Sequence, residues 1–335
     1  MTLANTYQIQ TVLGRIPADE LGVTDVHTHL IRDGGSLVDA DPDFYLASAE
    51  TAVDELRLFR HAGGGAVVDM MPAAPGRNAH RLAEISAAAG VHVIAATGFT
   101  SWSLYPGAVA WNCSEEELAA MSAAEVTDGI DAGNYSEATV RRSPVRAGVI
   151  KVSLENDVPS NGELKFIGAA ARAHCLTGAP VSVHTHRGLG ALGLVELLGH
   201  RGVDASALLL AHAFQPGNSA LLRSLAAAGA FLIVDGAGKP HCDEAALIAE
   251  VGKLVQAGFA DRLLLASDFS RRRYWRSCGG NPGFAYLIDS FALRLTSHGI
   301  PESVVRRMLV ANPARALSLR QTAGCTHANL SLSER

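Results

Sequence analysis

The stretch from Gly22 to Leu30, GVTDVHTHL, decides the predicted fold. It is a short apolar run with two histidines, His27 and His29, at alternate positions near its end. Side chains alternate between the two faces of a strand, so both imidazoles point the same way. Seven more runs of this kind follow, and their near-continuous apolar character is typical of strands buried on both faces of a parallel sheet. They are Gly64–Met71, Val91–Phe99, Ala147–Leu154, Pro180–His186, Ala207–Ala213, Ala230–Gly236 and Arg262–Phe269.

Segments with helical spacing separate these runs, and glycines follow several of them where a left-handed residue would end a helix. The alternation predicts an α/β protein, a (β/α)8 TIM barrel with a single domain over residues 1–335. We expect the barrel core over about residues 20–318 and a polar tail over 319–335. A doubly wound open sheet is the alternative, disfavoured because no GxGxxG follows the first run. The helical segments are Asn78–Ala89, Leu164–His174, Leu189–His200, Ser219–Ala228 and Asp243–Ala257, and the glycines are Gly90, Gly178, Gly202, Gly229 and Gly258.

Composition argues against several classes of protein. The 335 residues include 28 Lys+Arg and 33 Asp+Glu, for a net charge of −5, and the longest basic run is Arg271–Arg273, so we expect no nucleic-acid partner. The chain has no uninterrupted apolar stretch of the roughly 18 residues that a membrane span needs, so we expect no membrane partner. The N-terminus lacks a signal-peptide pattern and the five cysteines form no CxxC pair. These features predict a cytoplasmic protein with reduced thiols that acts on a small molecule.

Four of the later runs carry a polar residue among apolar ones near the carboxyl end of the strand: Lys151, His184, His212 and Asp268. A lone buried histidine is usually a satisfied core residue, and burying any of these groups unpaired would be costly. Together with His27 and His29 they amount to four imidazoles, one carboxylate and one amine at the face where barrel active sites lie. Imidazole and carboxylate are metal ligands, so we interpret the set as a metal centre.

Lys151 has a role of its own in this interpretation. Divalent cations would repel a charged ammonium, but burial and neighbouring positive charge lower a lysine pKa and leave a neutral amine. That amine can add carbon dioxide, and the resulting carbamate can bridge two metal ions. The negative charges of the carbamate, Asp268 and a bridging hydroxide would nearly balance two divalent cations. The alternative is a lysine that extends out of the barrel to solvent.

These motifs, in this order, resemble the phosphotriesterase family of the amidohydrolase superfamily. The resemblance extends over roughly Ile9 to Leu319. Its details are similar to the phosphotriesterase homology proteins and the phosphotriesterase-like lactonases, because Arg271-Arg272 precede Gly279-Gly280 and because Asp235 is followed by Gly238-Lys239. The shared motifs are HxH in the first run, IK in the fourth, VHTH in the fifth, AH in the sixth, SD in the eighth and the late Asn312-Pro313-Ala314-Arg315.

The resemblance implies two divalent metal ions per chain. His27, His29 and Asp268 would bind the more buried ion. His184 and His212 would bind the outer ion, and a carbamylated Lys151 would bridge both. Zinc is the first expectation, although the ligand set also accommodates Mn, Co or Fe. A hydroxide shared by the ions would attack the substrate, with Asp268 and Lys151 as the catalytic residues and Asp268 taking up the proton. The resemblance also implies a homodimer.

The site predicts a binuclear metal-dependent hydrolase that acts on a carboxyl-type bond of a lactone, ester or amide. Phosphotriester hydrolysis at the same site is the alternative activity. A metal-stabilised barrel that binds a ligand without turnover is a second alternative, disfavoured because all six ligand-type residues are present. A mononuclear deaminase with an unmodified Lys151 is a third.

Two long loops, 100–146 and 270–284, follow strands on the active-site face and are predicted to carry substrate contacts. The arginines at 271–273 suggest an anionic group on the substrate, such as a carboxylate or phosphate, and a solvated basic loop is the alternative. Gly236 stands where the family often has His or Arg, and we expect Lys239 or His241 to take that role. The candidate substrate contacts are Trp102, Tyr105, His186, Lys239, His241, Arg271, Arg272 and Tyr274.

Overall fold

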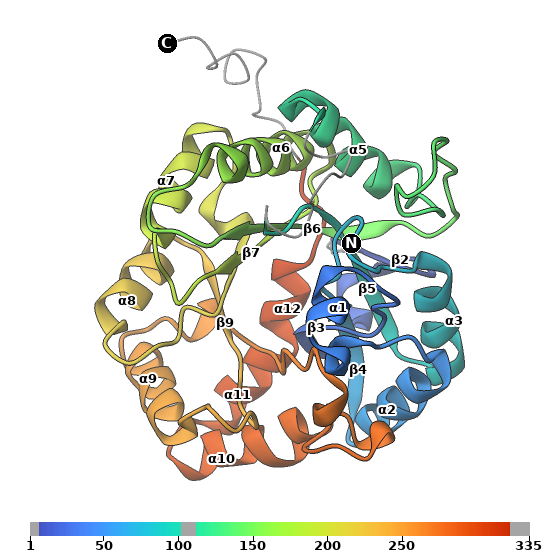
Figure 1. Ribbon diagram of the computed structural model, residues 1–335. Coiled ribbons are helices and arrows are strands. Elements are labelled where there is room, and N and C mark those ends of the chain that lie inside the picture. The colour runs from blue at the N-terminus through green and yellow to red at the C-terminus, as the bar shows by residue number, and fades with distance from the viewer. Residues whose placement is uncertain (1–6, 102–111, 322–335) are drawn as a thin grey trace, which may run out of the picture.

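A computed structural model describes residues 7–101 and 112–321 (Figure 1). Eight parallel strands form one sheet in sequence order, and helices surround it (Figure 1). Each strand lies within one of the eight predicted runs, so the prediction of a (β/α)8 barrel is confirmed. The strands are β3 (Val23–Thr28), β4 (Gly64–Asp69), β5 (His92–Gly98), β6 (Ala147–Leu154), β7 (Val181–Thr185), β8 (Leu208–Ala211), β9 (Phe231–Val234) and β10 (Leu263–Leu265).

The first and last strands of the sheet meet through the residues at their carboxyl ends. The backbone N–H of Asp268 donates to the carbonyl of His27 at 2.8 Å, and that of Ser267 donates to Asp25 Oδ1 at 3.1 Å. These bonds bring the two edges of the sheet together and almost close the barrel. The closure places two predicted metal ligands, His27 and Asp268, on adjoining backbone.

Several helices begin or end at residues that are typical of helix caps. At the start of α6, the Ser160 hydroxyl accepts from the Glu163 N–H and the Glu163 carboxylate accepts from the Ser160 N–H, which is a capping box. Gly178 ends this helix at φ 73°. All five glycines predicted to be left-handed have positive φ, which confirms that prediction. The helices are α1 (Ser36–Ala40), α2 (Ala49–His61), α3 (Ala79–Ala89), α5 (Glu115–Thr127), α6 (Asn161–Thr177), α7 (Ala191–His200), α8 (Ser219–Ala227), α9 (Glu244–Gln256), α10 (Ala292–Ser297), α11 (Glu302–Leu309) and α12 (Ala311–Ala316).

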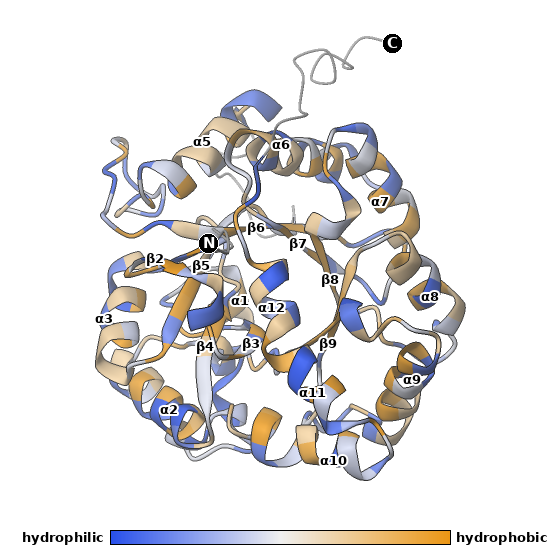
Figure 2. Cartoon of the chain, turned by 180° about the vertical axis from the view of Figure 1, so that it is seen from behind, coloured by the Kyte–Doolittle hydropathy of each residue, from blue (hydrophilic) through white to orange (hydrophobic). Residues whose placement is uncertain are grey.

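The inside of the barrel is a packed apolar core. Side chains such as Val26, Val68 and Ile94 form one buried cluster there. A second, larger cluster lies between the strands and the surrounding helices. Most strands are apolar along their length in Figure 2, whereas the helices mix apolar and polar residues. This pattern is expected of a parallel sheet covered by amphipathic helices.

An N-terminal hairpin, β1 (Gln8–Thr11) and β2 (Gly14–Pro17), lies outside the eight predicted runs. The two strands pair in antiparallel fashion, and Ile9, which has no exposed surface, joins the inner core of the barrel. Each strand has only four residues and mixes polar with apolar side chains, so its apolar pattern is too short to predict. Leu317 joins the same inner core, so both ends of the described barrel chain contribute to it.

Asn312, the first residue of the late Asn-Pro-Ala-Arg motif, makes buried hydrogen bonds to the backbone. Its side chain is fully buried, and its amide donates to the carbonyls of Ala260 at 2.9 Å and Leu263 at 2.7 Å. The contact joins α12 to the start of β10. Asn312 therefore has a structural role far from the predicted ligands.

The prediction of five reduced thiols is wrong at Cys175, which is disulfide-bonded, whereas Cys113, Cys242 and Cys278 are free. Within residues 7–101 and 112–321, no helix has the length and apolar character needed to cross a membrane.

Candidate functional site

The predicted ligands lie at the carboxyl end of the barrel, on five different strands or the residues that follow them. Three ring pairs show how closely the imidazoles gather. The ring centroids lie 5.7 Å apart for His27 and His29, 5.2 Å for His27 and His212, and 4.5 Å for His184 and His212. His212 and Asp268 both have positive φ, 63° and 51°, which is costly for residues other than glycine. Such strain is typical of functional positions.

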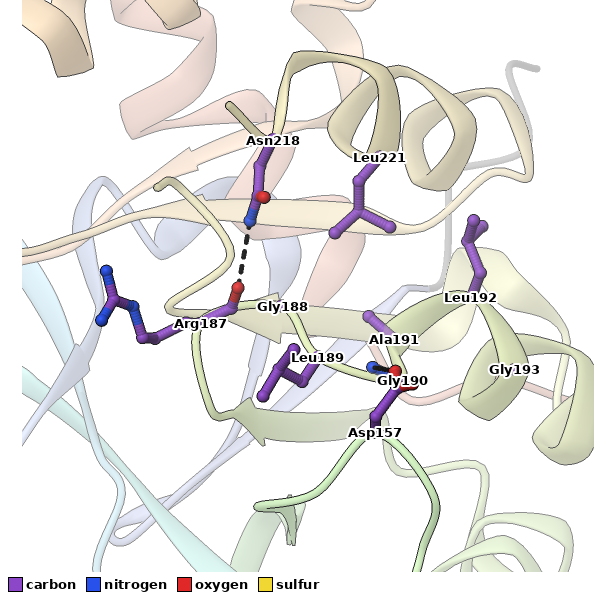
Figure 3. Close-up of a pocket in the computed structure, with 10 residues that line it drawn as sticks. All are labelled: Asp157, Arg187, Gly188, Leu189, Gly190, Ala191, Leu192, Gly193, Asn218 and Leu221. Atoms are coloured by element: carbon purple, nitrogen blue, oxygen red, sulfur yellow. Dashed lines mark hydrogen bonds between the residues drawn. The ribbon is translucent and has the colours of Figure 1, made fainter. Parts of the chain in front are cut away.

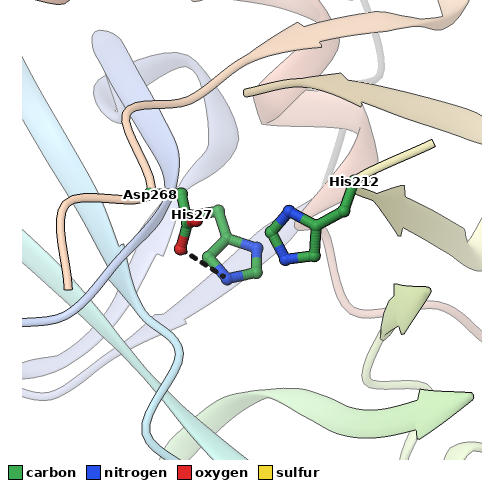
Figure 4. A group of neighbouring side chains, drawn as sticks. All are labelled: His27, His212 and Asp268. Carbon is green, nitrogen blue, oxygen red and sulfur yellow. Dashed lines mark ion pairs between the residues drawn. The ribbon is translucent and has the colours of Figure 1, made fainter. Parts of the chain in front are cut away.

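His27, His212 and Asp268 together could hold a cation (Figure 4). One potential ligand atom from each lies within 4.8 Å of the others. Asp268 Oδ1 lies 3.7 Å from His27 Nε2 and 3.8 Å from His29 Nε2, so the carboxylate faces two imidazoles at once. This spacing is wider than direct hydrogen bonding, and it suits groups that converge on an ion between them.

The protonation of three of the four histidines also fits a metal. Burial lowers the pKa of His27, His29 and His184 well below the usual value of 6.5. These imidazoles are therefore neutral near pH 7, and neutral imidazole is the form that binds metal. His27 Nδ1 is buried and has no hydrogen-bond partner among the described residues. An orphaned, buried nitrogen of this kind is costly unless something else contacts it.

Asp235 orients His212, and the prediction from sequence did not include it among the site residues. Its Oδ2 lies 2.9 Å from His212 Nδ1 and also accepts the backbone N–H of His212 at 2.8 Å. Burial opposes the charged form of His212, but the Asp235 carboxylate outweighs it and the pKa of His212 is raised. A carboxylate on Nδ1 leaves Nε2 to face the site, as in many metal-binding histidines.

Lys151 is buried, so the alternative in which it extends to solvent is wrong. Its Nζ donates to the Met70 carbonyl at 2.8 Å. Burial lowers its pKa to about 8, and its charge in turn disfavours protonation of His29. Gly98 lies opposite Lys151 in the sheet with φ 85°, and any side chain there would collide with the Lys151 backbone. The conformation of this lysine thus depends on a glycine in the neighbouring strand.

Other charged residues at this end of the barrel were also missed. Asp69 accepts the N–H groups of Leu30 and Met71 and fixes the chain beyond β3, and burial raises its pKa to about 6. Glu155 Oε1 lies 3.8 Å from His184 Nε2. Asp69 and Asp235 are acidic residues near the end of an apolar run. The criterion that selected His212 and Asp268, a polar residue near the carboxyl end of an apolar run, would therefore have selected Asp69 and Asp235 as well.

Lys239 reaches the site from the loop after β9. Its Nζ donates to Asp268 Oδ2, and it lies 5.9 Å from the centre of the Tyr274 ring. Burial opposes the charge of Lys239, but the Asp268 carboxylate outweighs it and the pKa of Lys239 is raised. Tyr274 is buried, with 7% of its surface exposed. Of the predicted substrate contacts, Lys239 thus bonds to a predicted ligand, and Tyr274 lies beside Lys239.

No hydrogen bond or ion pair joins the other described candidate contacts to the predicted ligands. Arg271 pairs with Asp41 at 3.0 Å, and its guanidinium lies 4.1 Å from the centre of the Phe44 ring. Arg272 is exposed and makes no ion pair within the described part of the chain. His186 and His241 are exposed. Trp102 and Tyr105 lie outside the described residues.

A separate cavity of about 440 Å³ lies over the start of α7 (Figure 3). It is lined by Asp157, Arg187, Asn218, Leu221 and residues 188–193, and includes none of the predicted ligands. Asp157 Oδ1 accepts the Gly190 N–H at 2.9 Å and so satisfies a backbone donor at the helix start.

Comparisons with known proteins identify the family of this chain. The model of the phosphotriesterase family matches residues 7–317. A phospho-furanose lactonase of Mycoplasmopsis synoviae is 32% identical over 92% of this chain and 91% of its own. The crystal structure of an amidohydrolase from Mycoplasma synoviae has a TM-score of 0.94 at 30% identity, covering 98% of this chain and 96% of its own. The phosphotriesterase homology protein from Escherichia coli, solved with phosphate in its active site, has a TM-score of 0.81 at 28% identity, covering 89% and 99% of the two chains. The chain belongs to the phosphotriesterase family and is a hydrolytic enzyme.

Proposed function

We propose that this protein is a metal-dependent lactonase whose substrate carries a phosphate group. The observation that carries the proposal is the buried Lys239, which bonds to Asp268 among the imidazoles and lies beside Tyr274. A buried ammonium at a hydrolytic centre is suited to an anionic substrate. The name phospho-furanose lactonase, given to a relative of similar length, supports the same chemistry.

We assign two divalent cations to the cluster. His27, His29 and Asp268 would hold one of them. His184 and His212 would hold the other, with a carbamylated Lys151 between the two. Such cations acidify water and polarise a carbonyl group when bound.

The residues of the chain divide the remaining tasks. Asp268 faces two imidazoles and is placed to accept the proton of the attacking water. Asp235 holds the His212 ring in one tautomer. Lys239, Arg271 and Tyr274 would bind the phosphate group, with the ammonium and the guanidinium as charged donors.

Charge favours this activity over phosphotriester hydrolysis. A phosphotriester is neutral, so it offers nothing to Lys239 or Arg271, whereas a phosphorylated lactone carries about two negative charges near pH 7. The alternative of a barrel without turnover is set aside by the hydrolytic character of the relatives. Dimer formation, a cytoplasmic location and zinc as the metal stay predictions.

A substrate screen tests the proposal. Protein reconstituted with Zn, Mn, Co or Fe would be assayed against phosphorylated furanose lactones, the same lactones without phosphate, esters, amides and a phosphotriester. We expect phosphorylated lactones to have kcat/KM about 100-fold or more above their neutral counterparts, because a charged subsite discriminates strongly. Metal analysis should give two ions per chain. Metal-loaded protein that hydrolyses none of the lactones would refute the proposal.

A further inference from the structure

Two loops at the carboxyl end of the barrel are joined by ion pairs. The loop after β3 contains the short 3-10 turn Pro42–Phe44, which Asp41 caps by accepting the Asp43 N–H at 3.1 Å. The same Asp41 pairs with Arg271 at 3.0 Å, in the loop after β10. Asp43 pairs with Arg273 of that loop and accepts its backbone N–H at 3.1 Å. The position of Arg271 therefore depends on the loop after β3.

Phe44 contacts two guanidinium groups in this region. The central carbon of Arg271 lies 4.1 Å from the centre of the Phe44 ring, and that of Arg32 lies 4.9 Å from it. Guanidinium groups bind aromatic faces electrostatically and through stacking of their planes. The Phe44 ring and the Asp41 carboxylate thus both contact the Arg271 guanidinium and hold it in place.

Arg32 places a second positive charge beside the Phe44 ring. It is only 3% exposed and forms no ion pair within residues 7–101 and 112–321. One of its terminal nitrogens donates to the Ser270 carbonyl at 3.4 Å and the other contacts Met71 Sδ at 3.3 Å, while its Nε has no hydrogen-bond partner there. Two like charges next to one ring repel each other, so Arg271 needs a partner that holds it in place. Phe44 and Asp41 are the groups in contact with it.

Backbone hydrogen bonds hold the turn that carries Phe44. Arg32 and Leu46 exchange two backbone hydrogen bonds, with the Arg32 N–H donating at 2.9 Å and the Leu46 N–H donating at 3.0 Å. The Phe44 N–H also donates to the Asp41 carbonyl at 3.0 Å. The ring is therefore presented by an ordered turn, which is what a positioning residue requires.

We infer that Phe44 is a positioning residue that orients Arg271 for binding the phosphate group of the substrate. The inference rests on the proposed function, in which Arg271 is one of the phosphate contacts. Phe44 touches neither the predicted ligands nor the reacting bond in this account. Its effect should appear in the recognition of charged substrates and not in the chemistry of the lactone ring.

Substitution of Phe44 with an aliphatic and with an aromatic residue separates packing from the aromatic face. For Phe44→Leu we expect KM for a phosphorylated lactone, and the inhibition constant of inorganic phosphate, to rise by about 3- to 30-fold, the range of a partly desolvated cation–π contact. The value of kcat, and kcat/KM for a neutral lactone, should change by less than about twofold. Phe44→Trp keeps the aromatic face and should stay within about threefold of wild type. Tyr45→Leu, on the exposed neighbour, is the matched control.

A double-mutant cycle with Arg271→Gln makes the test specific. Once Arg271 is removed, Phe44→Leu should no longer weaken phosphate binding, which calorimetry on the metal-loaded protein measures without any turnover. An equal effect of Phe44→Leu in both backgrounds overturns the inference, and so does Phe44→Trp behaving like Phe44→Leu. Failure of the wild type to hydrolyse phosphorylated lactones would defeat the proposed function instead, and the binding cycle would still decide the role of Phe44.

Discussion

Replacement of Asp235 by Asn tests whether this carboxylate organises the proposed metal site. The carboxylate lies 2.9 Å from His212 Nδ1 and also accepts the His212 backbone N–H at 2.8 Å. The substitution removes the charge and leaves a side chain of the same shape. His212 has positive φ, so its backbone is in a conformation that is strained for a residue other than glycine.

The expected cost follows from the hydrogen bond that the ligand loses. A carboxylate that holds a metal-binding histidine typically contributes about 10- to 100-fold in metal affinity, which is about 1.4 to 2.8 kcal/mol. Zinc titrated against a competing chelator, with metal content per chain as the readout, measures the change. One ion should be released about 10- to 100-fold more readily and the other should change little, because His27 and His29 do not contact Asp235. Asp19→Asn, at an exposed position, is the control.

The same variant has a predicted pH dependence in the metal-free protein. The pKa of His212 is raised above 6.5 in the fold, so its pairing with Asp235 stabilises the protein fully below about pH 6.5. That stability is lost as the pH rises through the raised pKa. The difference in Tm between wild type and Asp235→Asn should thus be larger at pH 5.5 than at pH 8.5. Unchanged zinc affinity together with a pH-independent Tm difference would show that the pair does not organise the site.

Three further predictions concern other parts of the molecule. Lys151→Ala should lower metal content and abolish most hydrolysis, with partial rescue by short carboxylic acids, and full activity would exclude a bridging role. Lys239→Met should raise KM for phosphorylated lactones about tenfold or more while neutral lactones are affected less, because it removes a charged donor that now bonds to Asp268. Glu125→Gln should destabilise the fold by about 3 kcal/mol or more in chemical denaturation, because Arg77 pairs with Glu125 at 2.7 Å and both side chains are fully buried. A loss of stability below about 1 kcal/mol would show that solvent reaches the pair.

The sequence predicted the barrel because its signals were local and repeated. Runs such as Ala147–Leu154 are apolar apart from Lys151 and Ser153, as is typical of a strand buried on both faces. The hairpin Gln8–Pro17 escaped prediction because each of its strands has only four residues, although Ile9 joins the inner core and Ile16 packs against it. The burial of Ile9 depends on contact with the barrel, and a local sequence pattern cannot predict that contact.

The candidate site was likewise predicted only in part. His212 and Asp268 were predicted as site residues because each is a polar residue near the carboxyl end of an apolar run. The structure brings their ligand atoms within 4.8 Å of each other and of His27. The ion-pair partners of the arginines could not be predicted in this way. Sequence alone could not tell that Arg271 is paired with Asp41, some 230 residues earlier in the chain, because that contact joins two loops.

By itself, the sequence determined the fold class and the chemical types gathered at one end of the barrel, since both follow from strand alternation and from the cost of burying lone polar groups. Only the tertiary structure decided which charges neutralise one another. Lys239 bonds to Asp268, Asp235 to His212, and Asp41 to Arg271. Electrostatic energy depends on distances of a few ångströms between segments that are far apart in sequence, and the closure of the barrel sets those distances.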